Sequence, residues 1–323
     1  MVIVYVLVLR NAVPAAVADT NHVFSMVNEF LRQRGKDPLF SMHLVGMSRE
    51  VSLNNGAFRL HPGMLLTEAG LPDLIIIPSM TGDMMTATFL NKEFAAWIAS
   101  QYRRGAAVAS LCTGAFLLAY SGILKGKQCT THWAYANEFR HHYPSVELLD
   151  ERMITDQNGL YSSGGNNAYW NLLLHLVEKY TDRAMAIRTA KYFVIELGRE
   201  VQSPFIIFQG LKDHEDDLVR KAQELIELRY HDKLTVDQLA EACHLSRRTF
   251  ERRFKKATRH SIFEYIQRTR VEAARQKLEM GRSSIQDIMY DVGYSDIQTF
   301  REVFKDITGM TPLDYRDKYN KGI

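Results

Sequence analysis

The fold of the C-terminal part is decided by the stretch Arg247-Arg-Thr-Phe-Glu-Arg-Arg-Phe-Lys-Lys-Ala-Thr-Arg259, whose pattern recurs fifty residues later. Two dipeptides, a threonine and a downstream tyrosine have identical counterparts at that spacing. The matched pairs are Thr249 and Thr299, Phe250 and Phe300, Phe254 and Phe304, Lys255 and Lys305, Thr258 and Thr308, and Tyr265 and Tyr315. A repeat of this kind predicts two copies of one supersecondary unit.

Each copy has the pattern helix, tight turn, helix. In the first copy, Thr235 begins a capping box and Ser246 is placed to cap the second helix. In the second copy, Val292-Gly-Tyr294 forms the turn, and Ser295 or Asp296 caps the helix after it. A glycine in the turn is typical of helix-turn-helix units. We therefore expect an all-α C-terminal domain with two such units.

The second helix of the first copy is strongly basic, with seven Lys or Arg residues and one acid between Arg247 and Arg259. Phe250 and Phe254 are spaced i, i+4 and face the core, so the charged residues project outward. A solvated charged surface is the alternative interpretation, but the surrounding repeat favours a helix that reads the DNA major groove. The expected DNA-binding residues are Arg247, Arg248, Glu251, Arg252 and Lys255 in the first copy, and Asp296, Ile297, Gln298, Thr299, Arg301, Glu302 and Lys305 in the second.

Residues 218–318 resemble the DNA-binding domain of AraC-family transcriptional regulators. The resemblance rests on Leu245-Ser-Arg-Arg-Thr-Phe-Glu-Arg-Arg-Phe254, on Asp287-Ile-Met-Tyr-Asp-Val-Gly-Tyr-Ser-Asp296, and on Gly309-Met-Thr-Pro-Leu-Asp-Tyr-Arg316. It implies a long helix near 262–279 that joins two subdomains, and two reading helices in successive major-groove segments of a double-stranded promoter. The chain departs from the family at Arg259-His-Ser261, where a glycine-containing turn is common.

The first 180 residues alternate short β-branched runs with helical patterns, which predicts a mostly parallel sheet with helices on both faces. We expect a flavodoxin-like α/β domain at 1–198, a linker at 199–216 and the helix-turn-helix domain at 217–323. Expected strands lie at 2–9, 42–46, 74–78 and 106–110, with weaker ones near 129, 146 and 160, and a hairpin near 54–56. Expected helices lie at 22–34, 89–103, 114–121, 132–142, 169–177 and 183–197.

The segment Ser110-Leu-Cys-Thr-Gly114 is typical of a turn that presents a nucleophile between a strand and a helix. Together with Ile77-Pro78, Thr130-Thr-His-Trp133 and Ser162-Ser-Gly-Gly-Asn166, it makes residues 1–190 resemble the PfpI-like, class I glutamine-amidotransferase-like superfamily. More narrowly, the domain resembles the amidase-like sensor domain fused to one branch of AraC-family regulators. The resemblance implies that His132 is the family's histidine.

Catalysis by Cys112 would require a thiolate, a nearby histidine and an acid after the first strand. Ala16 stands where the acid is expected, Asp19 is out of register, and His22 replaces a common aspartate. Thr113 also stands where the protease-like members have histidine. We therefore expect no enzyme, with Cys112 and His132 as vestigial catalytic residues.

We expect the first domain to bind a small-molecule effector instead. The expected ligand-binding residues are Cys112, Thr113, His132, Trp133, Ser163, Gly164, Gly165 and Asn166. The backbone amides of the last four residues offer an anion site at a strand-to-helix turn, and an ordinary helix cap is the alternative. Two other functions stay open, a cysteine-dependent amidase or deglycase with a DNA-targeting domain, and a redox sensor at Cys112.

Composition places the chain in the ordinary soluble class, with 24% charged residues and a formal net charge of +3. Its three cysteines have neither a disulfide framework nor metal-ligand spacing, which favours a reducing cytoplasm without a metal. The apolar start, 2–9, is too short to span a bilayer. We expect a cytoplasmic homodimer with no cofactor and no membrane partner, acting as a sequence-specific transcription regulator.

Overall fold

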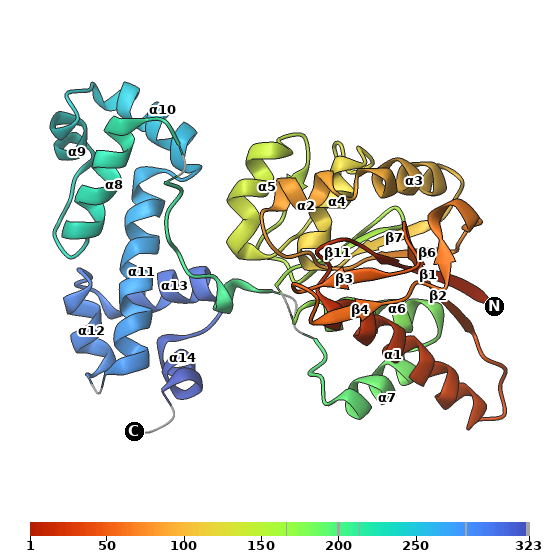
Figure 1. Cartoon of the computed structure of the whole chain (residues 1–323). Coiled ribbons are helices and arrows are strands. Elements are labelled where there is room, and N and C mark those ends of the chain that lie inside the picture. Colours follow the sequence, from red (N-terminus) through yellow and green to blue (C-terminus); the bar gives the residue numbers. More distant parts are fainter. Residues whose placement is uncertain (166, 199–200, 213, 282, 321–323) are drawn as a thin grey trace. The chain divides into compact units, whose positions relative to one another are not determined.

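The computed structural model describes residues 1–165, 167–198, 201–212, 214–281 and 283–320. The chain forms two compact units, Met1–Gln202 and Ser203–Ile323 (Figure 1). The division lies inside the stretch 199–216 that was expected to be a linker, and positions 199, 200 and 213 of that stretch lie outside the described residues. No helix in the described ranges is long and apolar enough to cross a membrane.

A seven-stranded sheet forms the centre of the first unit, in the order β10-β11-β7-β6-β1-β2-β5. Neighbouring strands are parallel except β10 and β11, which confirms the predicted parallel α/β fold. The strands are β1 (Val2–Val8), β2 (Phe40–Gly46), β5 (Met64–Leu65), β6 (Leu74–Ile77), β7 (Ala107–Ser110), β10 (Ile154–Gln157) and β11 (Leu160–Ser163). All of β6 is buried, as a continuous apolar run predicts for a strand covered on both faces.

Helices cover both faces of this sheet (Figure 1). On one face lie α1 (Pro14–Arg32), α6 (Tyr169–Tyr180) and α7 (Arg183–Phe193). On the other lie α2 (Met84–Phe89), α3 (Lys92–Arg103) and α4 (Ala115–Tyr120), and α5 (Ala136–His142) follows later in the chain. One continuous hydrophobic core joins the sheet to both layers.

Several helices differ from their expected bounds: α5 begins at Ala136 rather than near 132, α7 ends at Phe193 rather than near 197, and two further differences have a local cause. Helix α1 begins at Pro14 rather than near His22, because proline is well suited to the first position of a helix. The helix expected at 89–103 is interrupted at Asn91, whose buried amide bonds the main chain of Arg10 and the carbonyl of Ala87. These side-chain bonds compete with helix hydrogen bonds, so α2 and α3 are separate.

Short elements complete the first unit. The predicted hairpin at 54–56 is confirmed by two antiparallel strands whose connecting residues have positive φ. The short strands are β3 (Val51–Leu53), β4 (Phe58–Leu60), β8 (Gln128–Cys129) and β9 (Glu147–Leu148). The 3-10 helices are η1 (Leu66–Glu68), η2 (Cys112–Gly114) and η3 (Trp133–Tyr135), with η4 (Ser203–Phe205) at the start of the second unit.

The described part of the second unit is otherwise built from α-helices. They are α8 (Asp217–Arg229), α9 (Val236–Ala242), α10 (Arg247–Thr258), α11 (Ile262–Met280), α12 (Ile285–Asp291), α13 (Ile297–Thr308) and α14 (Pro312–Tyr319). They pack around two separate hydrophobic cores. Helix α11 supplies Tyr265 to the first core and Leu278 to the second, so it joins two subdomains as the expected long helix near 262–279 should.

Candidate nucleic-acid interface and Cys112 site

Helix α10 is the second helix of the first helix-turn-helix unit. The Ser246 hydroxyl caps it by accepting a hydrogen bond from the Thr249 N–H. Phe250 and Phe254 are fully buried against the first core. The burial of this side of α10 directs its charged residues to the opposite side.

Helix α13 repeats this arrangement in the second unit. Phe300 and Phe304 are fully buried, and the Asp296 carboxylate caps the helix by accepting from the Thr299 N–H at 2.7 Å. The repeat extends to the core, where the Tyr265 hydroxyl donates to Glu227 and the Tyr315 hydroxyl to Glu279. The duplication read from the sequence is therefore a duplication of packing and of polar contacts.

The outward face of α10 carries exposed basic side chains. Arg247 is held by two carboxylates, that of Asp237 at 3.2 Å and that of Glu251 at 3.1 Å. By contrast, no ion pair within the described ranges involves Arg248, Arg252 or Lys255, which are all exposed. These three cations have the freedom to contact DNA, whereas Arg247 would first have to leave its partners.

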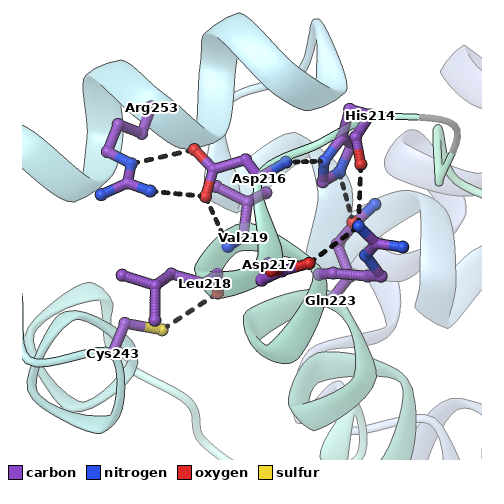
Figure 2. Close-up of polar contacts among 9 residues, drawn as sticks. His214, Asp216, Asp217, Leu218, Val219, Gln223, Cys243 and Arg253 are labelled. Carbon is purple, nitrogen blue, oxygen red and sulfur yellow. Dashed lines mark hydrogen bonds and ion pairs between the residues drawn. The ribbon is translucent and has the colours of Figure 1, made fainter.

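Arg253 lies on the other side of α10 and fixes the helix to its own unit (Figure 2). Its guanidinium donates through Nε at 2.9 Å and through Nη2 at 2.7 Å to the two carboxylate oxygens of Asp216. Asp216 also caps α8 by accepting from the Val219 N–H. The hydrogen bonds from Arg253 lower the pKa of Asp216. Arg253 therefore fixes the orientation of α10 relative to the start of α8.

The outward face of α13 is less basic than that of α10. Gln298, Arg301, Glu302 and Lys305 are exposed. Three other expected DNA-binding residues have structural roles, since Asp296 and Thr299 form the helix cap and Ile297 packs partly buried on the second core. The remaining exposed polar side chains on this face are Gln298, Arg301, Glu302 and Lys305, of which Gln298 donates to the Glu302 carboxylate at 3.3 Å.

Cys112 lies at the carboxyl end of β7, in the turn that leads into α4. Its φ of 53° is unusual for a residue with a side chain, and its N–H donates to the Ser163 hydroxyl at 3.1 Å. The side chain is buried, and burial raises the pKa of the thiol to about 12. At neutral pH Cys112 is therefore a thiol and not the thiolate that nucleophilic attack requires.

Thr113 holds the turn in place through the neighbouring loop. Its hydroxyl donates to the Met80 carbonyl at 2.7 Å and accepts from the Met80 N–H at 2.8 Å. At Gly114 a Cβ would lie 2.7 Å from the carbonyl oxygens of Ile77 and Pro78, so only glycine fits. The hydroxyl of Thr113, an expected ligand-binding residue, is thus used within the protein.

His132 begins η3 and is half-buried. Its Nδ1 accepts from the Ala134 N–H at 3.1 Å, and burial lowers its pKa, so the ring is neutral. In the described part of the chain no hydrogen bond joins His132 to Cys112. The Trp133 ring lies beside the imidazole, with centroids 5.5 Å apart. The Cys112 thiol and the His132 imidazole are thus both uncharged near neutral pH.

The turn after β11 is occupied by the protein's own groups. The Gly164 N–H donates to the Met153 carbonyl, and the Gly165 N–H donates to Oε1 of Gln202 at 2.9 Å. Gln202 covers the turn so closely that a Cβ on Gly164 would lie 2.5 Å from its Nε2. An anion at this turn would have to displace Gln202. Asn166, also expected to bind ligand, lies outside the described residues.

An acid does lie near the site, but it bonds a tyrosine. The Tyr169 hydroxyl donates to the Asp19 carboxylate at 2.5 Å, while Ala16 is buried in α1 and His22 is exposed. Burial, and then the hydrogen bond to the Asp19 carboxylate, raise the pKa of Tyr169. The sequence did not indicate this pair, because its two residues lie far apart in the chain. Gln202 was missed as well, because it lay in the expected linker.

Comparisons with known proteins agree with this division into two parts. Residues 39–179 match the DJ-1/PfpI family, and residues 239–318 match a helix-turn-helix domain. The HTH-type transcriptional regulator GbdR of Pseudomonas aeruginosa is 25% identical over 312 residues, which cover 96% of this chain and 83% of that protein. Similarity to a transcription regulator thus extends over nearly the whole chain.

Two further comparisons concern mainly the first unit. The crystal structure of a THiJ/PfpI family protein from Pseudomonas syringae has a similar fold, with a TM-score of 0.50 at 17% identity, over 75% of this chain and 90% of that one. Isonitrile hydratase of Pseudomonas putida is 26% identical over 170 residues, 52% of this chain and 70% of that protein. The similarity to that enzyme covers about half of this chain, whereas the similarity to GbdR covers nearly all of it.

Proposed function

We propose, from the premise that this chain is an AraC-type helix-turn-helix transcription regulator with an N-terminal DJ-1/PfpI domain, that its first unit senses a small-molecule effector and thereby changes how α10 and α13 bind a promoter. The regulator class and DNA binding follow from the family. The effector site, its residues and the assembly of two copies are our proposals.

The observation that carries the DNA-binding geometry is the duplicated packing of α10 and α13. In each helix two phenylalanines are fixed in a core, so the opposite side faces solvent along its whole length. Arginine side chains on such a helix pair with guanine edges in the major groove. We propose that Arg252 and Arg301 read bases, and that Arg248, Lys255 and Lys305 contact phosphates.

The effector is proposed to bind beside Cys112, His132 and Trp133. The buried thiol and the neutral imidazole supply weak polar contacts, and the indole supplies an apolar surface. Because Cys112 is protonated, a ligand at this site would be held without forming a covalent bond. An effector acts only if it binds two states of the protein with different affinity.

A gel-shift experiment with fragmented genomic DNA tests DNA recognition. We expect the full-length protein to select particular fragments, and Arg252→Ala to weaken and relax that selection. Arg34→Ala is the matched control, since it removes one exposed arginine from the first unit and should leave selection unchanged. Weak, sequence-blind binding by the unaltered protein would contradict the proposal.

A thermal-shift screen of small metabolites tests the effector site. A true effector should raise the melting temperature and change the affinity for the selected fragment, because linkage is reciprocal. His132→Ala should remove both effects, whereas His61→Ala, at an exposed position, should remove neither. A compound that still acts fully on His132→Ala binds elsewhere.

A further inference from the structure

Two successive buried residues form the junction between the units. Gln202 is the last residue of the first unit and Ser203 is the first of the second. Gln202 is 2% exposed and Ser203 is 7% exposed. A junction with no structural role would be solvated and unpaired. Here Gln202 is buried within the first unit and Ser203 within the second, so both residues on either side of the joining peptide bond are fixed.

Gln202 is anchored in the first unit by its whole side chain. Its Nε2 donates to the carbonyls of Asp150 at 2.6 Å and Thr131 at 3.0 Å, and its Oε1 accepts from the Gly165 N–H at 2.9 Å. Its own N–H donates to the Glu151 carbonyl. A buried amide with every one of these groups paired is costly to move, because each lost bond leaves a polar atom unsatisfied.

The same anchor reaches the Cys112 site through one residue. Thr131 gives its carbonyl to Gln202 and its hydroxyl to the Cys112 carbonyl, at 3.0 Å. Thr131 is fully buried and directly precedes His132. A displacement of Cys112 or His132 would therefore change the geometry of the Thr131 carbonyl that holds Gln202.

Ser203 is anchored in the second unit by a buried arginine of α11. Arg275 is 4% exposed, and its Nη2 donates to the Ser203 carbonyl at 2.9 Å. Its Nη1 donates to the Ile206 carbonyl and pairs with Glu272. The 3-10 helix that begins at Ser203, η4, lies against the reading helix α13. The start of the second unit is thus fixed to the helix that joins its subdomains and to one that contacts DNA.

We propose that Gln202 and Ser203 form a coupling joint, in which Gln202 is a positioning residue that transmits changes at the Cys112 site to α11 and α13. The inference rests on the proposed function, because it concerns how that site and DNA binding influence each other. The route is Cys112, Thr131, Gln202, Ser203 and Arg275, and each step is a hydrogen bond or a covalent bond. Because adjacent residues are each held by hydrogen bonds within their own unit, a change in the bonds of one is passed to the other through a single peptide bond, whereas a solvated linker would absorb it.

The influence of two coupled sites on each other is reciprocal, so the joint can be tested from the DNA-binding side without a known effector. If the Cys112 site influences DNA binding, DNA binding must influence the Cys112 site by the same free energy. The probe is a duplex that the full-length protein has selected from genomic fragments, and the readout is amide hydrogen exchange at Gly165. We expect the exchange rate of that amide to change by about fivefold or more when the duplex binds.

Variants separate the joint from the anchors on either side of it. A short Gly-Ser insertion between Gln202 and Ser203 keeps both anchors but should abolish the DNA-induced change at Gly165, with DNA affinity retained. Gln202→Ala should also abolish it. The matched control is Gln209→Ala, because Gln209 is an exposed glutamine shortly after the junction and should keep the response.

The outcomes distinguish this inference from the proposed function. If the unaltered protein binds its selected duplex and the Gly165 rate does not change, the joint is overturned and the regulator is not. If the insertion variant keeps the full change, the joint is also overturned, whether or not Gln202→Ala folds. If no duplex can be selected, the proposed function fails, and the inference fails with it.

Discussion

His244 and Gly293 occupy equivalent turns of the two helix-turn-helix units, and both have left-handed backbone, with φ of 53° and 87°. At Gly293 a Cβ would lie 2.7 Å from the His231 carbonyl oxygen, so glycine is required by space as well as by conformation. His244 is exposed and carries its side chain in a conformation that costs a non-glycine residue about 1 kcal/mol.

This difference predicts opposite results for two substitutions. His244→Gly should raise the free energy of unfolding by up to about 1 kcal/mol, less the entropy cost of a more flexible unfolded chain. Gly293→Ala should lower it by more than that, because the new methyl group meets the backbone. Urea unfolding measured by circular dichroism tests both, and an equal effect of the two would show that the turns are not equivalent.

Asp216 predicts a stability difference that depends on pH. Its pKa is lowered in the folded protein, chiefly by hydrogen bonds from Arg253, so the contribution is present above the unfolded pKa of about 3.9 and is lost as pH falls through the folded pKa. Asp216→Ala should lower the free energy of unfolding by about 1 kcal/mol near neutral pH, since it also removes the cap of α8.

Asp216→Asn is the control for the cap, because asparagine caps helices as well as aspartate does. It should be less destabilising than the alanine variant near neutral pH, and its difference from the unaltered protein should disappear as pH falls through the folded pKa of Asp216. A difference that stays constant with pH would mean that the ion pair with Arg253 does not contribute.

Cys112 should be unreactive. With a thiol pKa of about 12, roughly one molecule in ten thousand carries the thiolate at pH 8, far fewer than for an ordinary cysteine. We expect iodoacetamide and hydrogen peroxide to leave Cys112 unmodified in the folded protein, as measured by mass spectrometry of peptides. The denatured protein is the control for reagent activity. Rapid labelling in the folded protein would instead favour the redox-sensor or enzyme hypothesis.

Two neighbouring glycines should respond differently to alanine. Gly164→Ala places a Cβ 2.5 Å from the amide nitrogen of Gln202, which must leave its hydrogen bonds, so a loss of about 1–3 kcal/mol is expected. Gly165→Ala places a Cβ at 3.5 Å from the same side chain, an ordinary contact, and should change stability by less than about 0.5 kcal/mol. Similar losses at both positions, measured by urea unfolding, would show that Gln202 does not cover this turn.

The second unit could be predicted closely because its information is local and duplicated. The spacing of Phe250 and Phe254, repeated at Phe300 and Phe304, determines which side of each helix is buried. The capping residues Thr235 and Ser246 are also read from neighbouring positions, and the structure confirms both caps. Such patterns need no knowledge of distant contacts.

The arrangement around Cys112 could be predicted only in part, because it depends on residues far apart in the chain. Tyr169 and Asp19 are 150 positions apart, and Gly165 and Gln202 are 37 apart. Nothing in the local pattern around Gln202 distinguishes a buried anchor from a linker residue. The interruption at Asn91 is of the same kind, since it arises from a bond to Arg10 on another element.

The most direct test of the account is a footprint of the protein on its selected duplex, combined with affinity measurements for Arg252→Ala and Arg301→Ala. We expect protection of two major-groove segments about one helical turn apart on one face of the DNA. Each variant should weaken binding by about 10- to 100-fold and relax base preference in one segment only, a different one for each. A footprint confined to one segment, or variants that alter only the salt dependence, would contradict the claim that both helices read bases.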